Sequence, residues 1–164
     1  MDKFVYLVTQ LPALEFNGPA PWTTERFRDE AEKWLSERDR RVLEGARLDA
    51  SSVPGDPEPE ALRAYRAFDR RLRAALIAWR RRESEDGRLP DPPPGIPRDG
   101  NPLERETALW RLRWQRLEEL ETGHHFDLTI LILYYLKLQI AERLGRFDAE
   151  AGMRHFHTLS EVAS

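Results

Sequence analysis

The strongest constraint on this chain is one long apolar stretch, residues 126–144, which reads F-D-L-T-I-L-I-L-Y-Y-L-K-L-Q-I-A-E-R-L. Asp127 stands at the position of a helix N-cap, where its carboxylate can accept the unpaired N–H groups of the first turn. Gly145 stands where a chain commonly leaves a helix through a left-handed residue. The stretch therefore predicts a helix over residues 128–144.

The first three turns of this helix are apolar on every side, which is typical of a helix buried in a protein core or in a membrane. A membrane span needs about 18 or more apolar residues. This run ends at Leu136, because Lys137 and Glu142 belong to a polar side that opens after it. We therefore expect a central core helix around which the other helices pack.

Composition narrows the class of protein. A length of 164 residues suits one domain over 1–164, and a net charge of −3 gives no general attraction to nucleic acids or anionic membranes. Without cysteine, the chain has no disulfide, thiolate metal ligand or cysteine nucleophile. The N-terminus lacks the pattern of a signal peptide, so we expect a cytoplasmic protein.

The first third of the chain predicts three short elements. Residues 4–11 favour a strand by propensity, but no other segment resembles a partner strand, so we favour a short buried helix over an edge strand. Thr23 or Thr24 caps a second helix, and Ser36 with Asp39 starts a third in the manner of a capping box. Their predicted inward residues are Phe27, Ala31, Trp34 and Leu35 for the second helix and Val42, Leu43 and Ala46 for the third.

A long helix is predicted from Glu60 to about Glu83. Its apolar residues recur every three or four positions and form one stripe: Leu62, Tyr65, Phe68, Leu72, Leu76 and Trp79. The following residues 84–102 contain six prolines, which cannot donate to a helical or sheet ladder. We expect this segment to be an exposed, flexible loop.

Asn101 and Pro102 then open a helix over 103–121, which Thr122 and Gly123 end. The predicted stripe of this helix is Leu103, Trp110, Trp114 and Leu117, and a last helix begins at Asp148 with Met153, Phe156 and Leu159 facing inward. Short links favour antiparallel neighbours, so the second half should be a three-helix antiparallel unit. The whole chain is predicted to be an all-α bundle of five to six helices.

Eight arginines, from Arg63 to Arg82, lie on the other faces of the long helix and could bind phosphate backbones. The aromatic residues there belong to the buried stripe, where they cannot stack on bases, and eight acids between Glu25 and Asp49 could neutralise part of the charge. We therefore favour a solvated or helix-contacting face over an acidic protein partner. A nucleic-acid-binding helical module is the alternative function.

Motifs for catalysis are missing from the sequence: it has no G-x-S-x-G, no phosphate-binding glycine loop and no H-E-x-x-H. Two of the four histidines, His155 and His157, would point roughly 200° apart on a helix, a poor arrangement for a metal ion. Glu142 falls on a polar helix flank, which favours a structural role. We expect no enzyme, no cofactor, no bound metal and no small-molecule substrate.

Two parts of the chain resemble an uncharacterised bacterial family whose genes accompany those of V-type ATP synthases. The first is the opening F-V-Y-L-V-T-Q-L-P-A-L-E-F, and the second runs from N-P-L-E-R-E at 101–106 through L-E-E-L to the apolar stretch. The second part is also similar, more distantly, to helices in the V/A-type ATPase subunit that joins the central shaft to the membrane ring. That shaft-to-ring subunit is built of several helical modules, whereas this chain has the length of about one.

The resemblance implies an all-helical, non-catalytic subunit or accessory protein whose partners are V/A-type ATPase subunits. It also implies that any membrane contact is indirect, at the inner face and through a complex. For the partner surface we single out aromatic and basic residues that could anchor a protein contact: Phe4, Tyr6, Trp22, Arg63, Arg66, Arg70 and Arg73.

Overall fold

Six α-helices make up the regular structure of the residues that the computed structural model describes, which are 3–49, 57–86 and 91–162, without the side chains of 83–86, 155 and 156. The helices are α1 (Lys3–Gln10), α2 (Thr24–Glu32), α3 (Glu37–Gly45), α4 (Glu60–Asp86), α5 (Pro102–Leu120) and α6 (Leu128–Val162). The predicted all-α bundle is confirmed, and residues 4–10 of the ambiguous segment 4–11 are helical rather than extended.

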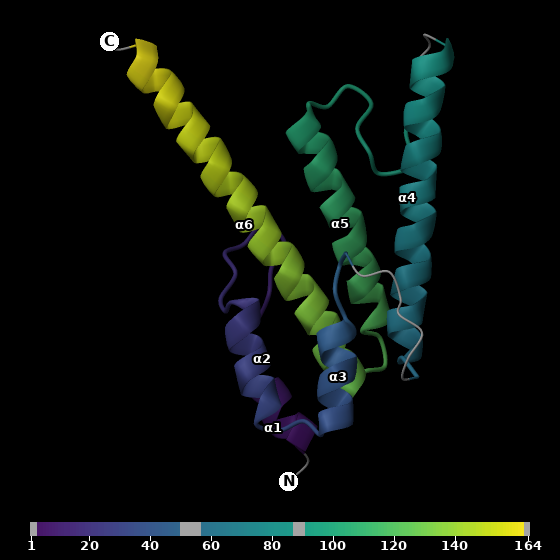
Figure 1. Ribbon diagram of the computed structural model, residues 1–164, viewed down its shortest axis with the longest axis vertical. Helices are drawn as coiled ribbons and strands as arrows, with labels where there is room; N and C mark the ends of the chain where they lie inside the picture. Colours follow the sequence, from purple (N-terminus) through teal and green to yellow (C-terminus); the bar gives the residue numbers. More distant parts are fainter. Residues whose placement is uncertain (1–2, 50–56, 87–90, 163–164) are drawn as a thin grey trace.

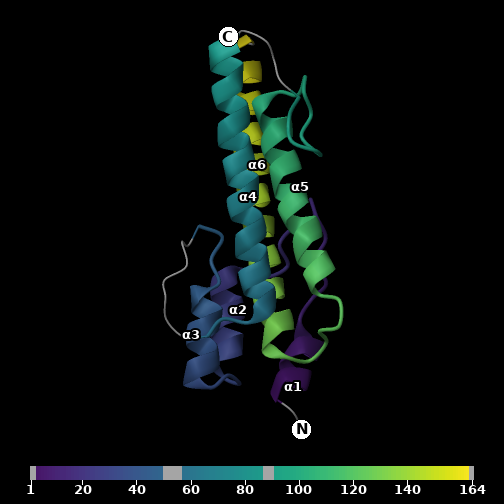
Figure 2. The same ribbon diagram turned by 90° about the vertical axis from the view of Figure 1, so that its right-hand side faces the viewer.

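The first half of α6 is the centre of the bundle. Its residues Leu131, Leu133 and Leu136 are fully buried, and α6 contacts α2, α3, α4 and α5. The long helices α4, α5 and α6 run side by side with alternating direction, while α1, α2 and α3 gather around one end of α6 (Figure 1 and Figure 2). The predicted role of the apolar stretch as a central core helix is confirmed.

Two apolar clusters lie in this bundle. The larger one joins the first half of α6 to the short helices and to α4 and α5, through residues such as Leu7, Phe27, Leu43, Tyr65 and Trp114. The smaller one lies between the far ends of α4 and α5: Leu72, Leu76, Trp79, Ile96 and Leu109. The predicted stripe of α4 is therefore divided between the two clusters, with Phe68 half-buried against the smaller one.

The predicted helix starts agree with the capping geometry. Thr23 and Ser36 accept hydrogen bonds from the backbone N–H groups of Arg26 and Asp39. Asn101 and Glu104 form a complete capping box at the start of α5. The Asp127 carboxylate accepts from Ile130 N at 2.9 Å, and Gly123 has the positive φ of 87° expected after the end of α5. Each cap satisfies donors that the first turn leaves unpaired.

The predicted end of the central helix at Gly145 is wrong. α6 continues without a break through Gly145 to Val162, so the last helix expected from Asp148 belongs to it. A glycine inside a helix lowers its stability by only about 1 kcal/mol, and Phe147 packs against the larger cluster just beyond it. The second half is consequently the pair α5 and α6 rather than a three-helix unit.

The stripe predicted for α5 is also wrong at its first residue. Leu103 is 46% exposed, whereas Trp110, Trp114 and Leu117 are buried as expected. Leu103 lies in the first turn of α5, and Leu109 supplies the buried contact to the smaller cluster instead.

The proline-rich segment expected as an exposed, flexible loop over 84–102 is irregular and mostly exposed over residues 91–101, with one residue buried. Residues 84–86 belong to α4, residues 87–90 lie outside the described part, and Ile96 is only 6% exposed among the side chains of the smaller cluster. A turn places it there, with Ile96 N donating to Pro93 O at 3.1 Å and Gly95 at a φ of 89°. This backbone conformation favours glycine, and a Cβ at Gly95 would in addition lie 2.7 Å from Leu112 Cδ2, so that Leu112 would have to shift.

A buried ion pair joins α4 to α5. The Asp69 carboxylate binds Arg113 Nε at 2.8 Å and Arg73 Nε at 2.7 Å, and both Asp69 and Arg113 are buried. A buried guanidinium that loses its counterion keeps its full desolvation penalty. The Asp69 carboxylate therefore fixes how α4 and α5 sit against each other.

The burial of α6 predicts a large loss of stability for Leu133→Ala. Leu133 is fully buried, so the substitution should lower the free energy of unfolding by about 3 kcal/mol, measured by urea denaturation. The matched control, Leu103→Ala, removes an exposed leucine and should change it by less than about 0.5 kcal/mol. Equal losses for the two variants would contradict the central position of α6.

The buried ion pair predicts that Asp69→Asn lowers the free energy of unfolding by about 3 kcal/mol, because it leaves Arg113 buried without its counterion. Asp91 pairs with Arg98 at the surface, so Asp91→Asn should change it by less than about 1 kcal/mol in the same denaturation experiment. A neutral effect of Asp69→Asn would show that the charge of Asp69 does not stabilise the pair of helices.

Candidate functional site

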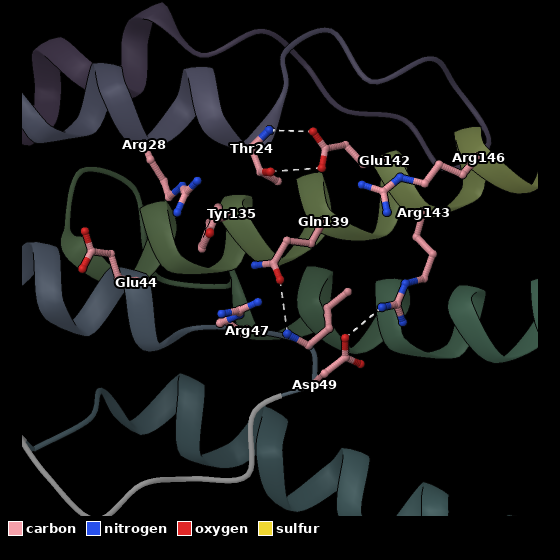
Figure 3. A pocket seen from close by; sticks show the side chains of 11 residues that line it. Thr24, Arg28, Glu44, Arg47, Asp49, Tyr135, Gln139, Glu142, Arg143 and Arg146 are labelled. Atoms are coloured by element: carbon pink, nitrogen blue, oxygen red, sulfur yellow. Dashed lines mark hydrogen bonds and ion pairs between the residues drawn. The ribbon is translucent and has the colours of Figure 1, made fainter.

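A polar cleft of about 570 Å³ lies between α2, the end of α3 and the middle of α6. Figure 3 shows the side chains that line it, which come from these elements and from the segment after α3. They are Thr24 and Arg28 from α2, Glu44 from α3, Arg47, Leu48 and Asp49 from the segment that follows, and Tyr135, Gln139, Glu142, Arg143 and Arg146 from α6.

Gln139 holds the segment after α3 against the central helix. Its Nε2 donates to Ala46 O at 2.8 Å, and its Oε1 accepts from Leu48 N at 3.2 Å. Ala46 and Leu48 are buried, so these bonds satisfy backbone groups that the end of α3 would otherwise leave unpaired. One wall of the cleft is fixed in this way.

Glu142 fixes the opposite wall. Its two carboxylate oxygens accept from Thr24 N at 2.7 Å and from Thr24 Oγ1 at 3.0 Å. Thr24 is the first residue of α2, whose backbone N–H has no partner within the helix, and a carboxylate is favoured at that positive end. Glu142 therefore has the structural role that was expected, because its hydrogen bonds join α2 to α6.

The charges of the cleft are not balanced. Four arginines face three carboxylates, of which Glu142 is engaged by Thr24 and Asp49 binds Arg143 Nη2 at 2.8 Å. Within the described residues, the side chains of Arg28, Arg47 and Arg146 form no ion pair and no hydrogen bond. Figure 3 shows their guanidinium groups arranged with that of Arg143 around Tyr135 and Gln139.

The arrangement is suited to binding anions. Guanidinium groups offer several fixed N–H donors each, and the Tyr135 hydroxyl adds another donor in the same space. No histidine, serine or cysteine is among the lining residues. Across the described residues, no three histidine, aspartate or glutamate side chains lie together as metal ligands.

The second half of α6 forms a lone helical arm. Beyond Phe147, the residues leave the bundle and point away from α4 and α5 toward the C-terminus (Figure 1). Met153, Leu159 and Val162 are 65%, 57% and 83% exposed, although the sequence pattern placed the first two on a buried face. The side chain of Phe156, the third predicted inward residue, lies outside the described part.

The aromatic residues predicted for the partner surface have different environments. Phe4 and Trp22 are half-buried against the larger cluster, and the Arg26 guanidinium covers the Trp22 ring at 4.7 Å from its centroid. Tyr6 is exposed and packs on Trp34, with ring centroids 4.3 Å apart. Phe4, Tyr6 and Trp22 therefore present one exposed ring, that of Tyr6, to a partner.

The arginines predicted for the same surface divide into two pairs. Arg66 binds Glu58 at 3.0 Å and donates to Gly45 O at 2.8 Å, while Arg73 binds Asp69 and donates to Leu48 O. Both thus tie α4 to neighbouring segments of the same chain. Arg63 and Arg70 are exposed on the outer face of α4. Nucleic-acid binding by this face stays a prediction.

Comparisons with protein-family models, with curated proteins and with solved structures gave no match. Among the described residues, no helix has an apolar run of the length that a bilayer crossing needs. Sequence reasoning missed the arginines of the cleft, because they lie on separate helices and share no local motif. For this region the sequence placed only Glu142 on a polar flank of the central helix, and it predicted a structural role and no binding site.

Two tyrosines of α6, Tyr134 and Tyr135, predict a loss of stability at high pH. Burial raises the pKa of Tyr134 to about 12 and raises the pKa of Tyr135, whereas both ionise near pH 10 in an unfolded chain. As the pH rises above about 10, the unfolded chain releases protons that the folded chain still holds, so the free energy of unfolding falls. Urea denaturation at a series of pH values measures the fall.

The matched variant for this pH dependence is Tyr134→Phe, which removes the hydroxyl that donates to Pro12 O at 2.8 Å. The free energy of unfolding of this variant should decline less steeply above pH 10. A wild-type chain whose stability is constant between pH 9 and pH 11 would contradict the burial of these hydroxyl groups.

Proposed function

We propose that this protein is a non-catalytic helical subunit or accessory protein of a bacterial V/A-type ATP synthase, similar to the subunit that joins shaft and membrane ring, and that it acts through protein–protein contacts. The observation that carries the proposal is the helical arm of α6, whose apolar residues Met153, Leu159 and Val162 are exposed. The arm extends from the most buried helix of the fold, so a force applied to it is transmitted directly to the core.

The energetics of the arm support a protein partner. Burying apolar surface contributes about 25 cal/mol per Å², and single exposed apolar residues are common on soluble proteins. In this protein three exposed apolar residues lie on the same part of α6. Beyond Phe147, this part of the helix has no neighbour in the described part of the chain. An isolated helix of this length is marginal in water, and most helical stability in proteins comes from packing of one face. A partner helix packed on the arm would supply that stabilisation.

The identity of the partner rests on the resemblance of residues 4–16 and of the region 101–143 to the family encoded with V-type ATP synthase genes. The distantly similar subunit of such machines joins the central shaft to the membrane ring. A chain that provides one rigid bundle and one projecting helix fits an accessory position at such a contact, and it needs no reactive group. Any membrane association then follows from the complex.

The proposal predicts that the tagged protein co-purifies with V/A-type ATPase subunits, identified by mass spectrometry, from cells that contain the complex. The double variant Met153→Ser/Leu159→Ser should lose this co-purification at least about tenfold, because it removes apolar contact area from the arm. Its core is untouched, so its thermal unfolding midpoint should stay close to that of the wild type.

The matched control is Ile77→Ser, which removes an equally exposed apolar residue from the outer face of α4 and should not affect the co-purification. Recovery of the wild-type protein alone, from membranes that hold an intact complex, would contradict the proposal. So would an equal loss in the Ile77→Ser variant, because it would assign the contact to the basic helix.

A further inference from the structure

We propose that the cleft between α2, α3 and α6 is a binding site for a phosphate-bearing anion, held by Arg28, Arg47, Arg143 and Arg146. This inference goes beyond the proposed function and does not rest on it. It comes from the placement of four guanidinium groups, on three separate parts of the chain, around one polar cavity (Figure 3).

The charge of the cleft favours an anion. Like charges that face one cavity repel each other, and the carboxylates nearby compensate for this only in part. Both oxygens of Glu142 accept hydrogen bonds from Thr24, and Asp49 is bound to Arg143. The third carboxylate, that of Glu44, lies 3.9 Å from Arg40, which is not part of the lining. In the described part of the chain, Arg28, Arg47 and Arg146 have no counterion at hydrogen-bond distance. A bound anion would remove the repulsion and accept their N–H groups.

The donors of the cleft come together from separate parts of the chain. Arg28, Arg47 and Tyr135 all line the cleft, and Figure 3 shows Tyr135 between the side chains of the two arginines. Arg28 belongs to α2, Arg47 follows α3 and Tyr135 belongs to α6. Oxygens of a phosphate placed beside Tyr135 would accept from its hydroxyl and from two separate arginines.

The volume and the lining of the cleft indicate which class of ligand it can hold. A volume of about 570 Å³ falls within the range of small-molecule sites, and Leu48 is the one aliphatic residue in the lining. Such a lining favours a compact, strongly charged molecule over an apolar one. Several planar guanidinium groups around one space match a group with many equivalent oxygens, which is the property of phosphate and diphosphate. The shared chemistry is a phosphoryl group, carried by a free molecule or by a lipid headgroup.

The backbone that forms the walls of the cleft is already held in place, so such a ligand could bind without moving it. Gln139 holds the backbone on both sides of Arg47, and Glu142 holds the first turn of α2, one turn before Arg28. The arginine side chains themselves are exposed or half-exposed and can adjust to the ligand. A ligand in the cleft would therefore tie α2 and the segment after α3 more firmly to α6.

The test is isothermal titration calorimetry of the full chain with inorganic pyrophosphate and, separately, with ATP. We expect binding of at least one of them, and we expect Arg28→Gln and Arg47→Gln each to weaken it about tenfold or more, because each removes charge-assisted hydrogen bonds. Tyr135→Phe keeps the ring that stacks on Phe27 and should weaken binding by a smaller factor. Circular dichroism verifies that each variant is folded.

The matched controls are Arg63→Gln and Arg70→Gln, which remove the same charge from the outer face of α4 and should leave the affinity within about twofold. No binding of either anion by the wild type at low salt would overturn the proposal. An equal loss of affinity in the control variants would also overturn it, because that result indicates diffuse attraction to arginines anywhere on the surface.

Vesicles of phosphatidylglycerol distinguish the two sources of the phosphoryl group. Vesicle binding that pyrophosphate abolishes, and that Arg47→Gln weakens, assigns the cleft to a lipid headgroup. Pyrophosphate or ATP binding without vesicle binding assigns it to a free phosphorylated molecule. Both results support the site, whereas vesicle binding that is unchanged in Arg28→Gln and Arg47→Gln and is not displaced by pyrophosphate contradicts it.

Discussion

The burial of the first half of α6 is the constraint on which the rest of the structure depends. A helix that is apolar on every side must be surrounded, and here α2, α3, α4 and α5 all pack on it, with Leu7 of α1 in the same cluster. The positions of the other helices follow from where their apolar faces can pack against this helix. The short helices cover one end and the antiparallel α4 and α5 lie along its side (Figure 1 and Figure 2).

The same helix creates both candidate functional surfaces, because its character changes along its length. Gln139 and Glu142 hold two neighbouring segments at hydrogen-bond distance, and the space left between these segments is the arginine-lined cleft. After Phe147 no part of the described chain covers the helix, and it becomes the arm. A ligand in the cleft and a partner on the arm would thus act on one continuous element of 35 residues.

Local signals allowed much of the fold to be predicted from the sequence. The caps at Thr23, Ser36, Asn101 and Asp127 are short-range hydrogen bonds, and the apolar stripe of α4 is a periodic pattern within one helix. The end expected at Gly145 was wrong because a glycine permits a helix end without requiring one. The burial of Ile96 and the cleft depend on residues far apart in sequence, which no local pattern reports. No local pattern distinguishes Arg28, Arg47 and Arg146 from other surface arginines, because only the fold brings them to one cleft.

α6 is one helix that is buried in its first half and uncovered in its second half. Amide hydrogen exchange of the isolated chain, followed residue by residue by NMR, tests this arrangement most directly. We predict that the amides of 131–144 exchange only through global unfolding, while those of 148–162 exchange orders of magnitude faster despite helical chemical shifts through Gly145. Equal protection of the two halves, or a loss of helical shifts at Gly145, would contradict the account.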